Sequence, residues 1–132
     1  MSLRTNMKHK IDRFFKLWAY SVSHSTLIIR SEKQYEDVIY DKVYENNVTV
    51  DIEFSGVNYM DIPSVFKHLN IEKIDGDMPS KFSQEIRQGT KLYCLNNSFY
   101  ILASSCIIGE STWSIEDRIH DMSLKYQKEL IL

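Results

Sequence analysis

Asp51 and Glu53 are the residue pair in this sequence whose spacing most resembles a catalytic arrangement. They alternate with Val50, Ile52 and Phe54, and such alternation predicts a strand that places both carboxylates on one face, roughly 7 Å apart. That separation suits acid–base chemistry on a glycoside, or a cation site. A strand with one wet face gives the same pattern. Because acids usually lie at the surface, a solvated pair is the favoured interpretation.

His24 lies among three hydroxyl side chains, those of Ser21, Ser23 and Ser25. A histidine beside hydroxyls can transfer protons near neutral pH. The segment also has the composition of a polar hairpin turn, in which hydroxyls bond their own backbone. The turn is the favoured interpretation. A small enzyme or ligand carrier that uses His24 and its serines, or the Asp51–Glu53 pair, is the alternative.

The other residue types that carry chemistry show no recognisable spacing. No two of the four histidines stand four residues apart, and none is near a cysteine cluster. Cys94 and Cys106 are predicted on opposite arms of one hairpin, where Cys94 faces Phe99, so they are too far apart for a disulfide. The four glycines occur singly, so no phosphate-binding loop exists. We therefore predict no catalytic residue, no metal ligand and no cofactor.

Basic and aromatic side chains alternate near the start of the chain, where Lys8, Lys10 and Arg13 precede Trp18 and Tyr20. Basic and stacking side chains together are typical of proteins that bind single-stranded nucleic acid. The following residues, 31–60, are rich in acids, and the net charge of the whole chain is −2. Neutralisation of the first segment by the second within the fold is therefore favoured, with nucleic-acid binding as a further alternative.

The composition favours strands. The chain has 132 residues, of which 12% are aromatic, with only 4 Gly and 2 Pro, and aromatic residues suit a half-buried pleated surface. Three hairpins are predicted: 14–22 with 26–30, buried on both faces; 48–54 with 57–60, in which Phe54 pairs with Val57; and 90–95 with 98–108, around Asn96 and Asn97.

Helices are predicted less widely. Short helical segments are expected over 8–14, where an ordered arm is the alternative, and over 64–69 and 81–88, with a C-terminal helix over 114–126. Residues 32–45 fit either a helix or a strand. The predicted fold class is α+β, in one domain over residues 1–132. A predominantly antiparallel β-sheet, curled or two-layered, would carry a few short helices and the C-terminal helix.

The apolar runs bear on location. None reaches the roughly 20 residues that a membrane-spanning helix needs. The first residues are polar and basic with no apolar signal-peptide core after them, and two cysteines in such a chain are expected to be free thiols. These features predict a cytoplasmic protein with no membrane partner.

Residues 18–31 and the turn Phe54-Ser55-Gly56-Val57 resemble a small bacterial family, a resemblance that implies no function. From the residues themselves we predict a non-catalytic binding or protein-interaction module that meets itself, as a homodimer, or another protein, through an aromatic sheet surface or an edge strand. The candidate binding residues are Trp18, Tyr20, His24, Arg30, Asp51 and Glu53.

Overall fold

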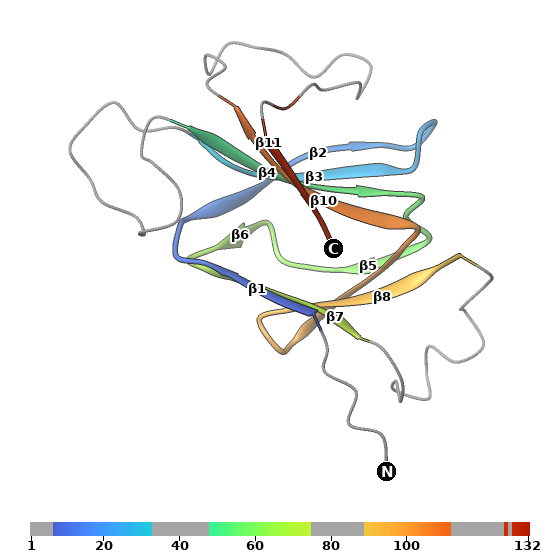
Figure 1. The fold of residues 1–132 in the computed structure, drawn as a ribbon. Coiled ribbons are helices and arrows are strands. Elements are labelled where there is room, and N and C mark those ends of the chain that lie inside the picture. The colour runs from blue at the N-terminus through green and yellow to red at the C-terminus, as the bar shows by residue number, and fades with distance from the viewer. Residues whose placement is uncertain (1–6, 33–47, 75–88, 112–125, 127) are drawn as a thin grey trace.

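Two antiparallel β-sheets form two layers (Figure 1). The computed structural model describes residues 7–32, 48–74, 89–111, 126 and 128–132. Sheet A has the strand order β1-β7-β8-β9-β5, and sheet B has the order β11-β10-β4-β3-β2-β6. The strands are β1 (Met7–Ile11), β2 (Phe15–Ser21), β3 (Thr26–Ser31), β4 (Thr49–Ser55), β5 (Tyr59–Asp61), β6 (Val65–Phe66), β7 (Leu69–Ile74), β8 (Lys91–Leu95), β9 (Phe99–Ala103), β10 (Ser105–Ser111) and β11 (Lys128–Ile131).

Two strand pairs run through both sheets and join them. β4 pairs with β10 in sheet B, and the same two chain segments continue as β5 paired with β9 in sheet A. In the same way, the β1–β7 pair of sheet A continues as the β2–β6 pair of sheet B. A strand pair that changes sheet must bend at a corner. At the first corner, Ser104 N donates to Ser55 O at 2.8 Å and Asn58 N donates to Leu102 O at 3.0 Å.

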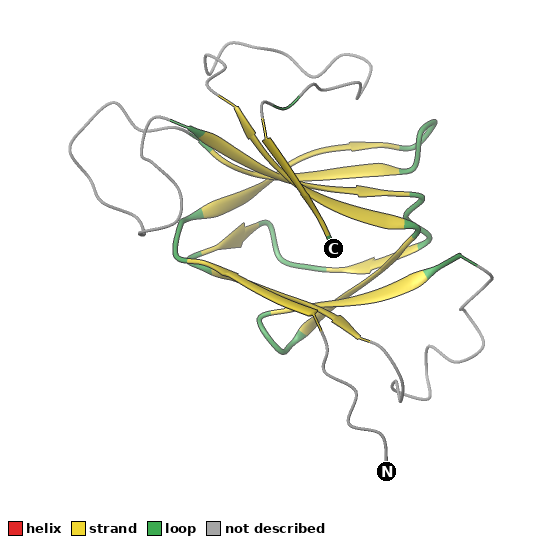
Figure 2. Cartoon of the chain, viewed as in Figure 1, coloured by secondary structure: helices red, strands yellow, loops and turns green. Residues whose placement is uncertain are grey.

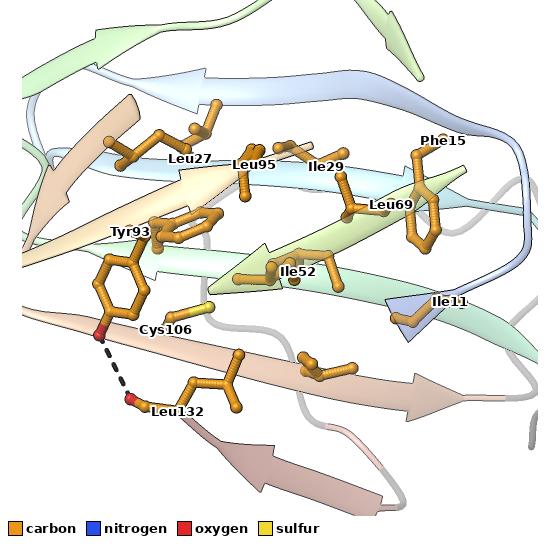
Figure 3. Close-up of a cluster of buried hydrophobic side chains, with 14 of the residues drawn as sticks. Ile11, Phe15, Leu27, Ile29, Ile52, Leu69, Tyr93, Leu95, Cys106 and Leu132 are labelled. Carbon is orange, nitrogen blue, oxygen red and sulfur yellow. Dashed lines mark hydrogen bonds between the residues drawn. The ribbon is translucent and has the colours of Figure 1, made fainter. Parts of the chain in front are cut away.

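Apolar side chains from both sheets meet between the layers (Figure 3). Ile29 and Ile52 come from sheet B, and Leu69 and Leu95 come from sheet A. Period-two alternation along each strand directs these residues inward. The rings of Phe54 and Tyr93 meet edge to face across the layers, with centroids 5.3 Å apart. The core therefore belongs to both sheets at once.

Arg13 is buried where the chain passes from β1 to β2, at the second corner. Its Nη2 donates to Glu32 O at 3.0 Å and to Val48 O at 2.9 Å. One guanidinium thus joins the end of β3 to the start of β4. Hydrogen bonds from a charged donor to buried carbonyls stabilise more than neutral ones.

The expected α+β class is wrong, because the described residues contain strands and no helix (Figure 2). Residues 8–14, expected to be helical or an ordered arm, are mostly β1, and residues 64–69 contain β6 and the start of β7. Apolar patterns this short do not separate helix from strand. Pairing with distant residues decides that these segments are strands, as when Ile11 of β1 lies opposite Leu69 of β7.

The remaining expected helices lie almost entirely outside the described residues. These are 32–45, 81–88 and 114–126, of which the structure describes only Glu32 and Tyr126, neither of them helical. The residues that follow Tyr126 include a strand, β11. That residues 1–132 form a single domain stays a prediction.

The hairpin prediction for β2 and β3 is confirmed in its pairing, although only β3 is buried on both faces while β2 is largely exposed. The β8–β9 hairpin is also confirmed, but Cys94 lies opposite Tyr100 rather than Phe99. Asn96 and Asn97 both have positive φ, of 51° and 59°, and Ser98 N donates to Leu95 O. The loop therefore has three residues, which shifts the register by one.

The predicted hairpin of 48–54 with 57–60 is wrong. Phe54 lies between Leu27 and Cys106 in sheet B, whereas Tyr59 pairs with Leu102 in sheet A. The expected strand 98–108 is likewise divided at Ser104 between β9 and β10. Gly56, with a φ of 65°, directs the chain to the other sheet instead of back along its own.

Gly56 should tolerate alanine much less well than Gly89. Both have positive φ, but a Cβ at position 56 would overlap the Ser104 side chain, whereas a Cβ at position 89 meets nothing within 4 Å. We expect Gly89→Ala to destabilise by about 1 kcal/mol from backbone strain alone, and Gly56→Ala by about 3 kcal/mol. Urea unfolding at equal m-value measures both. Equal losses would contradict the close approach of the two crossing segments.

Candidate functional site: a polar cluster on the outer face of sheet B

Five side chains gather on the face of sheet B that points away from the core, and we call them the outer cluster: Trp18, Arg30, Asp51, Glu53 and Tyr126. Alternation along β4 explains their position. Val50, Ile52 and Phe54 point into the core, so the acids between them point outward. Arg30 on β3 lies directly opposite Asp51.

Arg30 and Asp51 form a bidentate ion pair. Arg30 Nε donates to Asp51 Oδ1 at 2.7 Å, and Nη2 donates to Oδ2 at 2.8 Å. Both side chains are buried, and Asp51 is 0% exposed. Burial raises the pKa of Asp51, while the hydrogen bonds and charge of Arg30 act in the opposite direction. The two charges of Arg30 and Asp51 can be buried because the guanidinium donates a hydrogen bond to each carboxylate oxygen.

The Trp18 ring packs against the Arg30 guanidinium of this pair. The register of β2 against β3 shifts between Leu17 and Ala19, which makes Trp18 the extra residue of a β-bulge. The Arg30 guanidinium carbon lies 4.9 Å from the centre of the Trp18 ring. A cation over an indole face is attracted by the ring quadrupole, more strongly where water is excluded. The bulge therefore directs an aromatic ring onto the buried charge.

Tyr126 approaches Asp51 from the C-terminal segment. Its hydroxyl donates to Asp51 Oδ2 at 3.2 Å. Its ring lies directly over Gly109 of β10, where any Cβ would overlap ring atoms. Burial next to Asp51 raises the pKa of Tyr126, so the hydroxyl stays protonated and remains a donor. A glycine inside a strand thus makes room for an aromatic ring.

Glu53, the second acid of the outer cluster, is buried with 9% of its surface exposed. Burial, the charge of Asp51 and the charge of Glu129 all raise the pKa of Glu53 above its usual 4.5. Protonation is therefore easier in the folded chain than in the unfolded chain.

The structure brings four of the six sequence-predicted residues together: Trp18, Arg30, Asp51 and Glu53. The expectation that the two acids are solvated is wrong, because Asp51 and Glu53 are both buried on the outer face of sheet B. Tyr126 and Gly109 were missed as site residues by sequence reasoning, and Arg13, named only as a basic residue for nucleic-acid binding, is instead buried. The one available signal was Gly109, since a lone glycine in a strand pattern indicates close backbone approach.

Tyr20 and His24 lie outside the outer cluster. Tyr20 is exposed on β2. His24 is exposed in the turn after β2, with its Nδ1 3.0 Å from Ser21 Oγ and 3.1 Å from Ser23 Oγ. The Ser21 hydroxyl also accepts from His24 N at 3.3 Å. This is the self-bonded polar turn that the sequence favoured.

The chemistry open to the outer cluster is limited. Both oxygens of Asp51 already accept hydrogen bonds from Arg30, and Tyr126 donates to one of them, so the carboxylate has little capacity left to act on a substrate. Across the described ranges, no three His, Cys, Asp or Glu side chains gather as metal ligands would. The outer cluster joins β2, β3, β4 and the C-terminal segment through direct side-chain contacts. This geometry indicates a structural role, that of holding these elements together.

The basic N-terminal segment offers little to a nucleic acid. Arg13 is buried against backbone carbonyls, and Lys8 lies 3.7 Å from Glu72 in an exposed ion pair. Trp18 covers Arg30 instead of presenting a free ring. Lys10 stays exposed beside a hollow of about 280 Å³ that Ile11, Asp12, His68, Leu69 and Asn70 also line. That volume lies below the usual range for ligand sites.

Removing one member of the ion pair should destabilise the fold more than removing both. Arg30→Met leaves Asp51 buried without its cation, so we expect a loss of about 3–5 kcal/mol at pH 7. The double variant Arg30→Met/Asp51→Leu removes both charges of the pair and should lose far less than the sum of the single variants. Chemical denaturation of the four proteins in this cycle measures the coupling, and simple additivity would contradict a desolvated pair.

Glu53 should make the fold less stable as the pH rises. Its folded-state pKa is raised, so the contribution of Glu53 to the unfolding free energy is most favourable below the usual value of 4.5 and falls as the pH rises through the folded-state pKa. Glu53→Gln should therefore stabilise the chain at pH 7 and change little near pH 4. Glu110→Gln on β10 is the control for the amide substitution itself. An unchanged melting temperature for Glu53→Gln at pH 7 would contradict the prediction.

In the described part of the chain, no helix has the length and hydrophobicity to cross a bilayer. Comparison with known proteins finds no matching family model, no matching curated protein and no matching solved structure.

Proposed function

We propose that this protein is a non-catalytic interaction module that binds a protein partner, in the first place a second copy of itself, along the edge of β2. The observation that carries the proposal is an exposed apolar edge without charge. Leu17 and Tyr20 of β2 are exposed, and so is Val22, in the turn that follows β2, at 81%. Residues 17–29 contain no Asp, Glu, Lys or Arg, in a chain where these make up 26% of residues.

The hydrogen-bonding edge of β2 is only partly covered. β6 pairs with Phe15 and Lys16 alone, and Leu17 N donates to Ser64 O at 2.7 Å. Among the described residues, no strand pairs with Ala19–Ser21 on that side. Natural proteins usually protect such an edge with charges, above all lysine. Among the described residues, the protection of this edge beyond Lys16 is the bulge at Trp18. So little protection supports an edge that a partner covers.

A second copy suits this edge because of its neutrality. In a two-fold antiparallel pairing, each β2 residue meets a residue of the same strand in the other copy. Charges of one sign along the strand would oppose like charges and weaken the pairing. Leu17, Tyr20 and Val22 bring no such penalty and would bury apolar surface.

The enzyme alternative has no support in the geometry, since Asp51 is saturated by hydrogen bonds and His24 lies in an exposed turn. The cytoplasmic location stays a proposal. It is supported by the state of Cys94 and Cys106, which are free thiols in different sheets.

Light scattering on a size-exclusion column, at low and high salt with absorbance recorded at 260 and 280 nm, tests the proposal. We expect a dimer that survives high salt, because apolar contacts are not screened, and that carries no nucleic acid. Tyr20→Lys/Val22→Lys should shift the dimer to monomer. Met60→Lys changes an exposed apolar residue of β5 and should leave the dimer intact.

Two results would overturn this function. One is a wild-type monomer at every concentration tested. The other is a 260 nm absorbance that high salt removes, which would favour binding of nucleic acid by the N-terminal basic segment.

A further inference from the structure

The C-terminal strand β11 is an edge strand held mainly at its two ends. Its four residues pair with β10, from Lys128 opposite Glu110 to Ile131 opposite Ile107. All four are exposed, Ile131 at 64%. A strand with so little buried apolar surface belongs to the least stable part of a fold.

The first anchor of this segment is Tyr126. Its ring occupies the slot that Gly109 leaves on β10, and its hydroxyl donates to Asp51 at the end of that slot. The slot itself is made by β4 and β10, which pair with each other through seven residue positions of sheet B. Its walls therefore exist independently of the segment that fills it.

The second anchor is Leu132, which is 4% exposed and belongs to the core. Leu132 N donates to Cys106 O at 2.9 Å. The hydroxyl of Tyr93, on β8 of the other sheet, donates to Leu132 O at 3.3 Å (Figure 3). The last residue thus enters the space between the sheets and bonds to both.

We propose that the outer edge of β10, with the Gly109 slot and the Leu132 position, is a binding site for an extended peptide, and that Tyr126 and residues 128–132 of a second copy can occupy it in place of the chain's own. The ligand has tyrosine at its first position, a strand over its third to sixth positions and leucine at its seventh. Main-chain pairing supplies the affinity, and the two anchors supply the specificity.

A second copy is the occupant that fits best because it offers the same segment. Exchange of identical segments keeps every contact of β11, Tyr126 and Leu132, so its main penalty is the entropy of association. The chain's own segment has an effective concentration of about 1 mM or above when tethered. Exchange should therefore appear at high protein concentration and disappear on dilution.

Disulfide trapping between two full-length variants tests the exchange. One chain carries Ile107→Cys and the other carries Ile131→Cys, because these positions are opposite each other in the β10–β11 pair. Both chains also carry Tyr20→Lys/Val22→Lys, so assembly through β2 plays no part. The variants are unfolded in urea, refolded together at about 1 mM and at about 1 µM, and then oxidised.

We expect a heterodimer joined through positions 107 and 131, identified by peptide mass spectrometry, with a yield roughly tenfold or more higher in the concentrated sample. Each variant refolded alone measures random bonding, including any through the buried Cys94 and Cys106. The double variant Ile107→Cys/Ile131→Cys in one chain shows that the pair can be joined. If direct oxidation does not form the disulfide in the double variant, a short thiol-reactive crosslinker replaces oxidation in all samples.

Exchange is overturned if the double variant closes within one chain while the concentrated mixture gives no heterodimer above the single-variant background. Failure of exchange leaves the β2 proposal untouched, because that proposal is read from light scattering of chains with native β10 and β11. Failure of the β2 proposal likewise leaves the trapping result valid, since the trapped chains have that edge blocked.

Discussion

The rest of this structure depends on two strand pairs that belong to both sheets. A slip of one residue in the pairing of two strands would move every side chain of a strand to the opposite face of its sheet. Here the β4–β10 pair becomes β5–β9, and the β1–β7 pair becomes β2–β6, so any slip in one sheet would have to pass round a corner into the other. The corners are held by Gly56 against Ser104 and by the buried Arg13.

The outer cluster follows from that arrangement. Because β4 is fixed between β3 and β10, Asp51 lies opposite Arg30 on one side and opposite Gly109 on the other. Arg30 neutralises Asp51, and Gly109 admits the Tyr126 ring. A buried ion pair contributes little net stability by itself. Its contacts hold Trp18 of β2 and Tyr126 of the C-terminal segment against the outer face of sheet B.

The two ends of sheet B differ in how they close. At β2, a bulge and a two-residue partner strand leave a neutral apolar edge. At β10, the chain's own C-terminal residues cover the edge and are anchored at both ends. Each device answers the same problem of unpaired backbone groups at an edge. The first solution supports a partner outside the chain, and the second uses a segment that a second copy also carries.

The sequence by itself determined the local features: strand-rich composition, the β2–β3 and β8–β9 hairpins, the inward positions of Val50, Ile52 and Phe54, and the polar turn around His24. Each depends on neighbours within a few residues. Tertiary structure alone decided that the chain passes from one sheet to the other at two places. At Ser55–Gly56 the sequence predicted a hairpin turn, and at Ser104 it predicted a continuous strand. Tertiary structure also decided that β1 and β6 are strands, and that Asp51 is buried against Arg30 and Tyr126. These outcomes depend on contacts between residues far apart in the sequence. Asp51, for example, is 21 positions from Arg30 and 75 positions from Tyr126, and no local pattern encodes such contacts.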